Sequence, residues 1–326
     1  MRAGRRVRRH DRRTLAITSL LVLALPLAAA WAHDGLAPPA AAADAGATVA
    51  TIDRRPVSWT ARTMGTYVVV TLPTGDSAAV APVANLTLGV FRRVDSLMSN
   101  WTASSEVARI NRGAASGPMR VHPEVGAVID ASLRLWRESD GAFDITVEPL
   151  VRAWGFLGGP RRVPADAELR LALARVGAAR VRYDPATRML AFDGDSTRID
   201  LGGIAKGYAV DVAAESLKAH GVKDALVDLS GNMVALGSPA GGRGWRIGIR
   251  DPRDRIPYVA RIAIGDGAIS TSGQYEQFVA RDGRSYGHIL DPRTGRPAEG
   301  LISACSFTHR GLRYHNEVEA INRQEA

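Results

Sequence analysis

A histidine just before a rigid turn is the residue of this chain best suited to acid–base chemistry. His288 stands in the run Gly287-His-Ile-Leu-Asp-Pro-Arg-Thr-Gly295, where we expect a strand to end and Asp291-Pro292 to begin a turn. A histidine can take a proton from a hydroxyl group near neutral pH. A core histidine whose ring bonds a backbone carbonyl is the alternative interpretation, and the residues alone leave both open.

A second run, Asp200-Leu-Gly-Gly-Ile-Ala-Lys-Gly207, combines an acid, glycines and a lysine where a strand should give way to a helix. The glycines allow close approach to the backbone, and the N–H groups of a helix start can point at an anion. Lys206 in the first turn opposes the helix dipole, so it makes more sense facing a phosphate or a carboxylate. The run favours an anion site over a tight turn with a solvated lysine.

Other segments could support such a site. Asp144 in Gly141-Ala-Phe-Asp144 could accept a hydrogen bond from a ring N–H or a hydroxyl, coordinate a metal, or simply cap a turn. The hydroxyl-rich segments 228–232 and 269–273 could line a phosphate pocket or form an ordinary turn and strand. The sequence has no Walker loop, no G-x-G-x-x-G after a strand, no G-x-S-x-G elbow and no H-E-x-x-H. The common nucleotide, hydride-transfer and hydrolase classes are therefore excluded.

The elements that must position these residues are a mixture of helices and strands. Apolar spacing and turn residues predict helices over 80–98, 104–111, 123–138, 165–176 and 204–220. Strands are predicted over 62–72, 224–229, 233–236, 245–250, 258–264, 267–272, 276–280 and 287–290, with a hairpin over 181–192 and a turn into an extended segment over 141–147. Few regular βαβ units are present. We expect an α+β fold with mixed or antiparallel sheets flanked by helices.

Residues 1–32 have the pattern of a secretory signal peptide. Seven arginines precede the charge-free run 14–32, which closes at Ala30-Trp-Ala32, a small-residue cleavage site. An uncleaved membrane anchor is the alternative, because an apolar run of about 20 residues can span a bilayer. Arg12-Arg13-Thr-Leu15 also resembles a twin-arginine export signal. We expect an exported, periplasmic protein, tethered to the membrane if the signal stays uncleaved.

The positive charge of the chain is concentrated in this leader. Of the formal net charge of +9, residues 1–32 contribute +6 through seven arginines and Asp11, which leaves +3 for the remainder. The charge therefore does not indicate nucleic acid as a partner. Cys305 is the only cysteine, so none follows the apolar run to carry a lipid anchor. Residues 33–55, rich in alanine and proline, are expected to form a flexible linker.

Taken together, these runs resemble the ApbE family, the FAD:protein FMN transferases. The resemblance extends from about Thr63 to about Gly300. Its ordered pieces are Met64-Gly-Thr66, Met98-Ser-Asn-Trp101 with Ser105-Glu-Val-Ala-Arg-Ile-Asn111, Gly141-Ala-Phe-Asp-Ile-Thr-Val147, Asp200 to Asp211, Asp228-Leu-Ser-Gly-Asn232, Ile269-Ser-Thr-Ser-Gly-Gln-Tyr275 and His288-Ile-Leu-Asp-Pro-Arg-Thr-Gly295. The resemblance implies a T-fold-like domain over residues 56–300.

The resemblance also implies an activity and a site. Such proteins bind FAD and Mg²⁺, cleave the diphosphate, attach FMN through a phosphoester to a Thr or Ser of a target protein, and release AMP. Here the implied target is a membrane redox protein. By position, the residues implied to hold the flavin nucleotide are Met64, Trp101, Ala142, Phe143, Asp144, Asp200, Lys206 and Ile289. The backbone at Gly203 would help bind magnesium, and His288 would deprotonate the target hydroxyl.

The tail, residues 301–326, departs from the family pattern. Family members continue with a helix carrying Ala-x-x-Asp-x-x-x-Thr, which completes the metal site, and this spacing is missing here. Asn316 and Glu319 fall near the expected ligand distance in other surroundings, and the tail resembles a truncated or frameshifted end. Two alternatives follow: a Mg²⁺-dependent FAD diphosphatase that releases FMN and AMP, and a non-catalytic periplasmic flavin-binding protein.

Overall fold

The computed structural model describes residues 56–239 and 242–309. The expected signal peptide, the expected linker and residues 310–326 of the tail lie outside the described residues. In the part that is described, no helix is both long and apolar enough to cross a bilayer.

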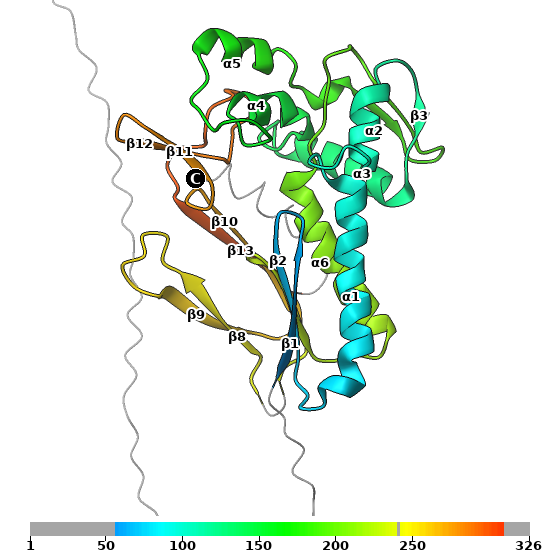
Figure 1. The fold of residues 1–326 in the computed structure, drawn as a ribbon, viewed down its shortest axis with the longest axis vertical. Helices are drawn as coiled ribbons and strands as arrows, with labels where there is room; N and C mark the ends of the chain where they lie inside the picture. Colours follow the sequence, from blue (N-terminus) through cyan, green and yellow to red (C-terminus); the bar gives the residue numbers. More distant parts are fainter. Residues whose placement is uncertain (1–55, 240–241, 310–326) are drawn as a thin grey trace, which may run out of the picture. The chain divides into compact units, whose positions relative to one another are not determined.

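A six-stranded sheet forms the centre of the fold, and all its strand pairs are antiparallel (Figure 1). In spatial order its strands are β1 (Val57–Thr63), β2 (Thr66–Leu72), β6 (Ala225–Leu229), β7 (Asn232–Leu236), β10 (Gly267–Gly273) and β13 (Ser303–His309). Side chains alternate between its faces, as the pleat requires. In β2, Val68 and Val70 are buried whereas Tyr67 is 59% exposed.

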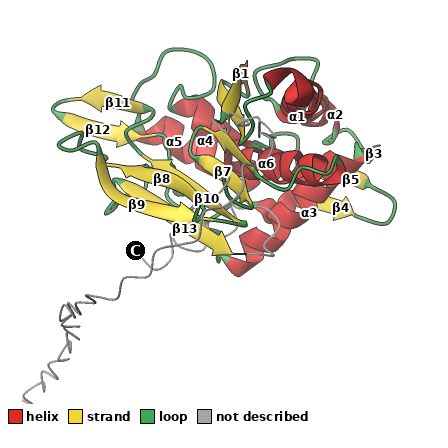
Figure 2. Ribbon diagram, turned by 90° about the horizontal axis from the view of Figure 1, so that it is seen from below, coloured by secondary structure: helices red, strands yellow, loops and turns green. Residues whose placement is uncertain are grey.

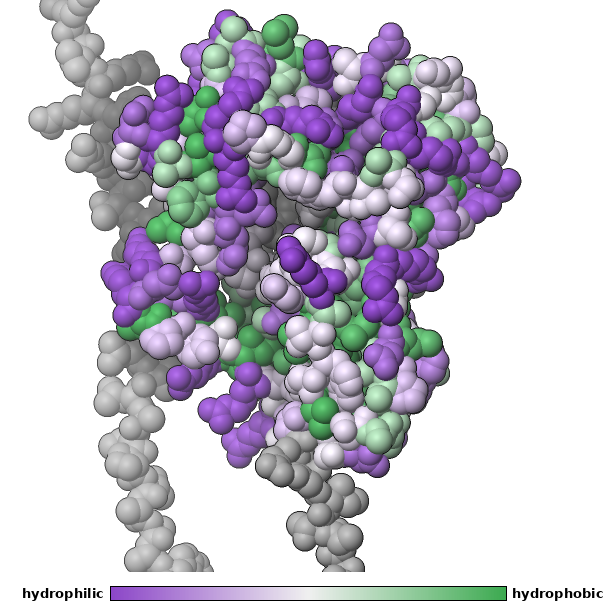
Figure 3. Space-filling view, in the orientation of Figure 1, coloured by the Kyte–Doolittle hydropathy of each residue, from purple (hydrophilic) through white to green (hydrophobic). Residues whose placement is uncertain are grey.

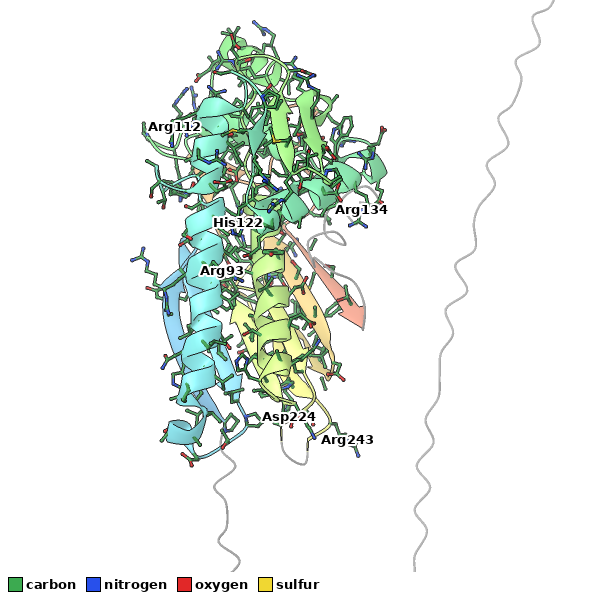
Figure 4. All side chains as sticks on the ribbon, turned by 90° about the vertical axis from the view of Figure 1, so that its right-hand side faces the viewer. Arg93, Arg112, His122, Arg134, Asp224 and Arg243 are labelled. Atoms are coloured by element: carbon green, nitrogen blue, oxygen red, sulfur yellow. The ribbon has the colours of Figure 1, made fainter. Side chains whose placement is uncertain are left out.

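Two long helices, α1 (Ser77–Met98) and α6 (Gly202–Ala219), cover one face of this sheet. Figure 4 shows them side by side in front of the strands. α1 starts where the Asp76 carboxylate accepts from Ala79 N–H at 3.0 Å, which satisfies one of the free donors of the first turn. Phe91 of α1 and Ala209 of α6 are completely buried in the main core. Burying a side chain such as Phe91 contributes about 1.5–3 kcal/mol.

A helical part follows α1 in sequence. It contains α2 (Glu106–Gly113), α3 (Pro123–Glu138), the 3-10 turns η1 (Ile145–Val147) and η2 (Ala178–Arg180), and a small antiparallel sheet in the order β3 (Met119–Arg120), β5 (Met189–Phe192), β4 (Val181–Asp184). α3 begins at Pro123, a residue whose fixed φ suits the first helical turn. Val125 and Ile129 of α3 pack into the same core as α1 and α6.

A second, smaller core lies under α4 (Glu148–Ala153), α5 (Asp166–Leu173) and the hairpin of β11 (Phe278–Arg281) and β12 (Arg284–Gly287). Trp154, Leu150, Leu169 and Leu290 are buried there. The smaller core therefore joins helices from the middle of the chain to strands near its end.

A separate hairpin consists of β8 (Trp245–Arg250) and β9 (Tyr258–Ile264) (Figure 2).

The predicted fold class is confirmed, and three local predictions were wrong. The single strand expected over 62–72 is two strands, because Met64 and Gly65 adopt positive φ (50° and 73°) and reverse the chain. The extended segment expected up to Val147 is instead the 3-10 turn η1, held by an Asp144 cap. The strand expected over 287–290 ends at Gly287, and Leu290 forms only an isolated bridge to Pro297.

Candidate functional site

The loop that enters α6 carries the predicted acid. Asp200 N–H donates to Ile145 O at 2.7 Å, and Asp200 Oδ1 accepts from Gly202 N–H at 2.7 Å. Burial raises the pKa of the Asp200 carboxyl, while hydrogen bonds from Gly202 and Asn100 and the charges of Lys206 and Arg152 oppose that rise. The N-cap residue, Leu201, makes no side-chain capping bond, so the Asp200 carboxylate is the side chain that bonds a free N–H in the first turn of α6. An acid and a half-buried lysine therefore lie together at a helix start.

Phe143 packs directly against this helix start. A Cβ added at Gly203 would lie 3.3 Å from Phe143 Cε2, so the ring and the glycine backbone are in close contact. Ser139 fixes the turn that carries the ring, because its Oγ accepts from Phe143 N–H at 3.0 Å and its backbone O accepts from Ala142 N–H at 3.0 Å. Ala142, Phe143 and Gly203 thus form a single surface beside Asp200.

Asp144 is buried behind that surface. Its side chain is 6% exposed; Oδ1 accepts from Thr146 N–H (2.7 Å) and Thr146 Oγ1–H (2.5 Å), and Oδ2 accepts from Ala178 N–H at 2.9 Å. Burial raises the pKa of this carboxyl against those hydrogen bonds. The bonds fit the turn-capping alternative, and direct contact of Asp144 with a ligand stays a prediction.

Met64 and Trp101 lie in the short connections that follow β1 and α1. Met64, with φ 50°, donates its N–H to Asp95 Oδ2 of α1 at 3.0 Å and packs its half-buried side chain on the core. Trp101 follows the end of α1 and is 70% exposed. A large, exposed aromatic side chain is available to stack on a flat ligand.

His288 directly follows β12, beside the smaller core. Its backbone N–H donates to Gln277 O at 3.0 Å, its Nδ1 lies 3.1 Å from the same oxygen, and its ring meets Phe156 edge-on at 6.2 Å. A carbonyl oxygen only accepts, so Nδ1 carries the hydrogen and Nε2 carries the lone pair. This is the tautomer that a general base requires. The alternative of a carbonyl-bonded histidine and the catalytic interpretation are therefore compatible.

Buried contacts hold the turn after His288 in place. Trp154 Nε1–H donates to Gly295 O at 2.9 Å, and Gly295, with φ 71°, lies against Leu150 and Leu169. The O atom of Ile289 accepts from Ala298 N–H at 2.8 Å. His288 is consequently presented by a rigid turn.

The structure collects eight of the ten predicted residues into two groups, and Met64 and Trp101 belong to neither. Ala142, Phe143, Asp144, Asp200, Gly203 and Lys206 meet at the start of α6, and His288 and Ile289 lie on the smaller core. Helix α4 links the groups, because Arg152 near its end influences the Asp200 carboxyl and Trp154 directly after it holds the His288 turn.

A hollow of about 870 Å³ borders α4. Its lining includes Asn100, Trp101 and Asn111, together with Arg152 of α4 and Arg175 from the segment after α5. Hydrophilic side chains cover much of the surface near α4 and α5 at the top of Figure 3. The lining of the hollow combines the exposed ring of Trp101 with guanidinium groups.

Sequence reasoning gave no role to several residues that hold the site. Asn100 and Asn111 bond the backbone before Asp200, and Trp154 and Phe156 support the His288 turn. The asparagines stood within segments of the family resemblance, which was the available signal for them. The tryptophan gave none, because its bonding partner is 141 residues away.

Asp228, near the end of β6, provides a test of the electrostatics. Burial raises its pKa, opposed by a 2.9 Å bond from Gly231 N–H to Oδ1. Such an acid contributes stability fully below its ordinary pKa of 3.8, and that contribution is lost as pH rises through the raised value. We expect Asp228→Asn to gain stability relative to the wild type as pH rises above about 3.8, then to level off. Urea unfolding at a series of pH values measures this difference.

Asp184→Asn is the matched control for Asp228→Asn. The Thr187 hydroxyl and the Ala186 N–H lower the pKa of the Asp184 carboxyl. Its stabilising effect is therefore present above the ordinary pKa and lost on acidification, so this variant should lose stability relative to the wild type as pH rises. Two variants with the same pH trend would contradict the assignment.

The chain is similar in sequence and structure to known proteins of one family. The model of the ApbE family matches residues 64–310. A Vibrio cholerae protein named FAD:protein FMN transferase is 37% identical over 218 residues, which are 65% of this chain and 64% of the relative. An Escherichia coli K12 protein of the same name is 30% identical over 259 residues, covering 77% and 73% of the two chains. The match to the Vibrio cholerae relative thus spans slightly less than two thirds of its length.

Solved structures give the same result. The ApbE protein of Thermotoga maritima superposes with a TM-score of 0.74 at 31% identity, covering 82% of this chain and 85% of that chain. The flavin transferase ApbE from Vibrio cholerae superposes with a TM-score of 0.72 at 30% identity and the same coverage.

Proposed function

The chain belongs to the ApbE family, and we propose that it acts as an FAD:protein FMN transferase. In this proposal the chain cleaves the diphosphate of FAD, joins FMN through a phosphoester to a Thr or Ser of a target protein, and releases AMP. The relatives and solved structures named above support the activity. The observation that carries it in this chain is the 3.1 Å contact between His288 Nδ1 and Gln277 O, from which we infer a neutral imidazole with Nε2 as its acceptor atom.

The proton and the bonds can be followed through the step. The target hydroxyl oxygen attacks the phosphorus of the FMN half, and its proton passes to Nε2 of His288. The bond between that phosphorus and the bridging oxygen breaks, and AMP leaves with the oxygen. A correctly placed base contributes about 10²–10⁴-fold to such a step. The Gln277 carbonyl keeps the imidazole ring oriented while Nε2 receives the proton.

The residues at the start of α6 suit the anionic part of FAD. Phosphoryl transfer needs placement and charge neutralisation more than covalent chemistry from the protein. Lys206 supplies a positive charge there, and backbone N–H groups at a helix start can bind phosphate oxygens. Met64, Trp101, Phe143 and Ile289 offer apolar surface for the flavin nucleotide.

Magnesium belongs to the proposal as an expectation of the family resemblance. Its charge would neutralise phosphate oxygens when it is bound. Within the described residues, no three side chains of His, Cys, Asp or Glu come together to hold a metal ion, so such side chains alone do not build a site for it there. The Asp200 carboxylate near Gly203 is already engaged by Gly202 N–H. The chemistry above therefore uses only residues of this chain.

The location and the partner complete the proposal. The leader supports export to the periplasm. After export the leader would be cleaved off, or would stay as a membrane tether. A periplasmic flavin transferase would act on redox proteins exposed on that side of the membrane. We therefore propose a membrane redox protein with an exposed Thr or Ser as the target.

Product analysis tests the activity. The full chain is incubated with FAD and Mg²⁺, with and without a redox protein that carries an unmodified acceptor threonine. Free FMN, AMP and protein-bound flavin are then quantified by chromatography and by in-gel fluorescence after denaturation. The proposal predicts AMP release that depends on the target and equals the flavin bound to it.

The other outcomes separate the alternatives. Equal amounts of free FMN and AMP without bound flavin would indicate a FAD diphosphatase, in which water replaces the target hydroxyl. Bound FAD without any product would indicate a flavin-binding protein. Either result would contradict the transferase proposal.

A further inference from the structure

Two asparagines hold the backbone that leads into Asp200. Asn111 Oδ1 accepts from Ile199 N–H at 2.8 Å, and Asn111 Nδ2–H donates to Ile199 O at 2.9 Å. Asn100 Nδ2–H donates to the same carbonyl at 3.1 Å. Asn111 Nδ2 also lies 3.1 Å from Asn100 Oδ1, to which it donates. The Asn111 amide therefore pairs with both polar groups of one residue, as a neighbouring strand would.

We propose that Asn111, assisted by Asn100, is a positioning residue that sets the geometry of Asp200 for the FAD reaction. The proposal rests on the proposed function, since Asp200 matters only if the start of α6 binds the nucleotide. Both asparagines belong to segments before α6: Asn100 follows α1, and Asn111 lies in α2. They therefore connect two helices of the main core to the loop of the site.

The residue that the asparagines bond lies directly beside the acid. Ile199 is completely buried and precedes Asp200, whose own N–H is bonded to Ile145 O. The Asn100 side chain is also near enough to the Asp200 carboxyl to oppose the rise of its pKa on burial. Both asparagines thus fix the chain, and Asn100 also acts on the acid.

An amide is the side chain that this place requires. Ile199 presents a donor and an acceptor, and only a group with both functions in one plane can bond the two at once. A carboxylate at position 111 could accept from the N–H but could not donate to the carbonyl. Leaving buried backbone groups unbonded is unfavourable, so without Asn111 the loop should shift to find other partners.

Arg109→Ala provides the matched control. Arg109 lies on α2, two residues before Asn111, and its guanidinium bonds Glu106 and the carbonyl of Arg120. Its removal costs hydrogen bonds on the same helix without touching Ile199. A general weakening of α2 would therefore affect Arg109→Ala and Asn111→Ala alike.

The experiment is a double-mutant cycle on FAD affinity and on the rate of AMP release. It compares the full-length wild type with Asn111→Ala, Asp200→Asn and the double variant, and includes Arg109→Ala. Asp200→Asn keeps an oxygen for the Gly202 N–H bond, so the loop retains that contact. We expect Asn111→Ala to reduce the rate or the affinity about tenfold, the size of one lost hydrogen bond. In the Asp200→Asn background, Asn111→Ala should reduce the rate or the affinity by less than about twofold further.

Several results would overturn the proposal. An equal loss in both backgrounds, or a loss that Arg109→Ala reproduces, would indicate a structural role alone. A wild type that binds FAD without transferring FMN would contradict the proposed function. The positioning role would then be tested by the FAD affinities of the variants alone. A wild type that binds no FAD would overturn both.

Discussion

His288→Ala is expected to slow FMN transfer about 10²–10⁴-fold, the usual contribution of a general base. Without the imidazole, the target hydroxyl has no group to receive its proton. The turn should persist, because Trp154 bonds Gly295 O and the Ile289 carbonyl bonds Ala298. FAD should therefore remain bound with similar affinity. Initial rates of flavin attachment and equilibrium titration with FAD measure the two quantities separately.

His220→Ala is the matched control for this change. His220 closes α6, and its Nδ1 also contacts a backbone carbonyl, Ser216 O at 2.8 Å. The two histidines share this tautomer-setting contact but not their place in the fold. Transfer that survives in His288→Ala, or that His220→Ala lowers equally, would remove the assigned role of His288.

Trp154→Ala is expected to cause the largest loss of stability. Trp154 is completely buried in the smaller core, where it stacks near Phe156 and Tyr286 and bonds Gly295 O. Removing a buried aromatic side chain from a core costs about 3–5 kcal/mol of unfolding free energy. The His288 turn rests on this core, so transfer activity should fall as well. Urea unfolding measures the free energy.

Two further variants divide this effect into its parts. Trp154→Phe keeps most of the apolar area and loses the bond to Gly295 O, so it should cost about 1–3 kcal/mol for the carbonyl left unbonded. Trp101→Ala removes a tryptophan that is 70% exposed and should change stability by no more than about 0.5 kcal/mol. A Trp154→Ala variant as stable as Trp101→Ala would contradict the described smaller core.

Local sequence patterns predicted most of the helices and strands, but fewer of the turns that connect them. The apolar spacing over 80–98 and 204–220 corresponds to α1 and α6, and the alternating runs correspond to strands of the central sheet. The turn at Met64 was missed because a methionine at positive φ has no ordinary sequence signal. The bond that Ala178 N–H donates to the Asp144 carboxylate is long-range, so the sequence could not distinguish the turn it stabilises from an extended segment.

The same distinction applies to the site. The residue types at 200–206 and 288 indicated anion binding and acid–base chemistry before any contact was known. The Asn111–Ile199 pair and the Trp154–Gly295 bond join positions 88 and 141 residues apart. Such pairs depend on how the helices and strands pack together, which short sequence patterns do not record. Residue types therefore suggest a chemistry from the sequence alone, whereas the contacts that hold those residues come only from the fold.

The intact mass of the target protein tests the central claim most directly. The full chain is incubated with FAD, Mg²⁺ and a target with its acceptor threonine, and in parallel with the same target carrying valine there. The account predicts a mass increase equal to FMN less one water on the threonine form alone. It also predicts that His288→Ala abolishes this increase and His220→Ala does not. An unchanged target mass, with FAD consumed or merely bound, would contradict the account.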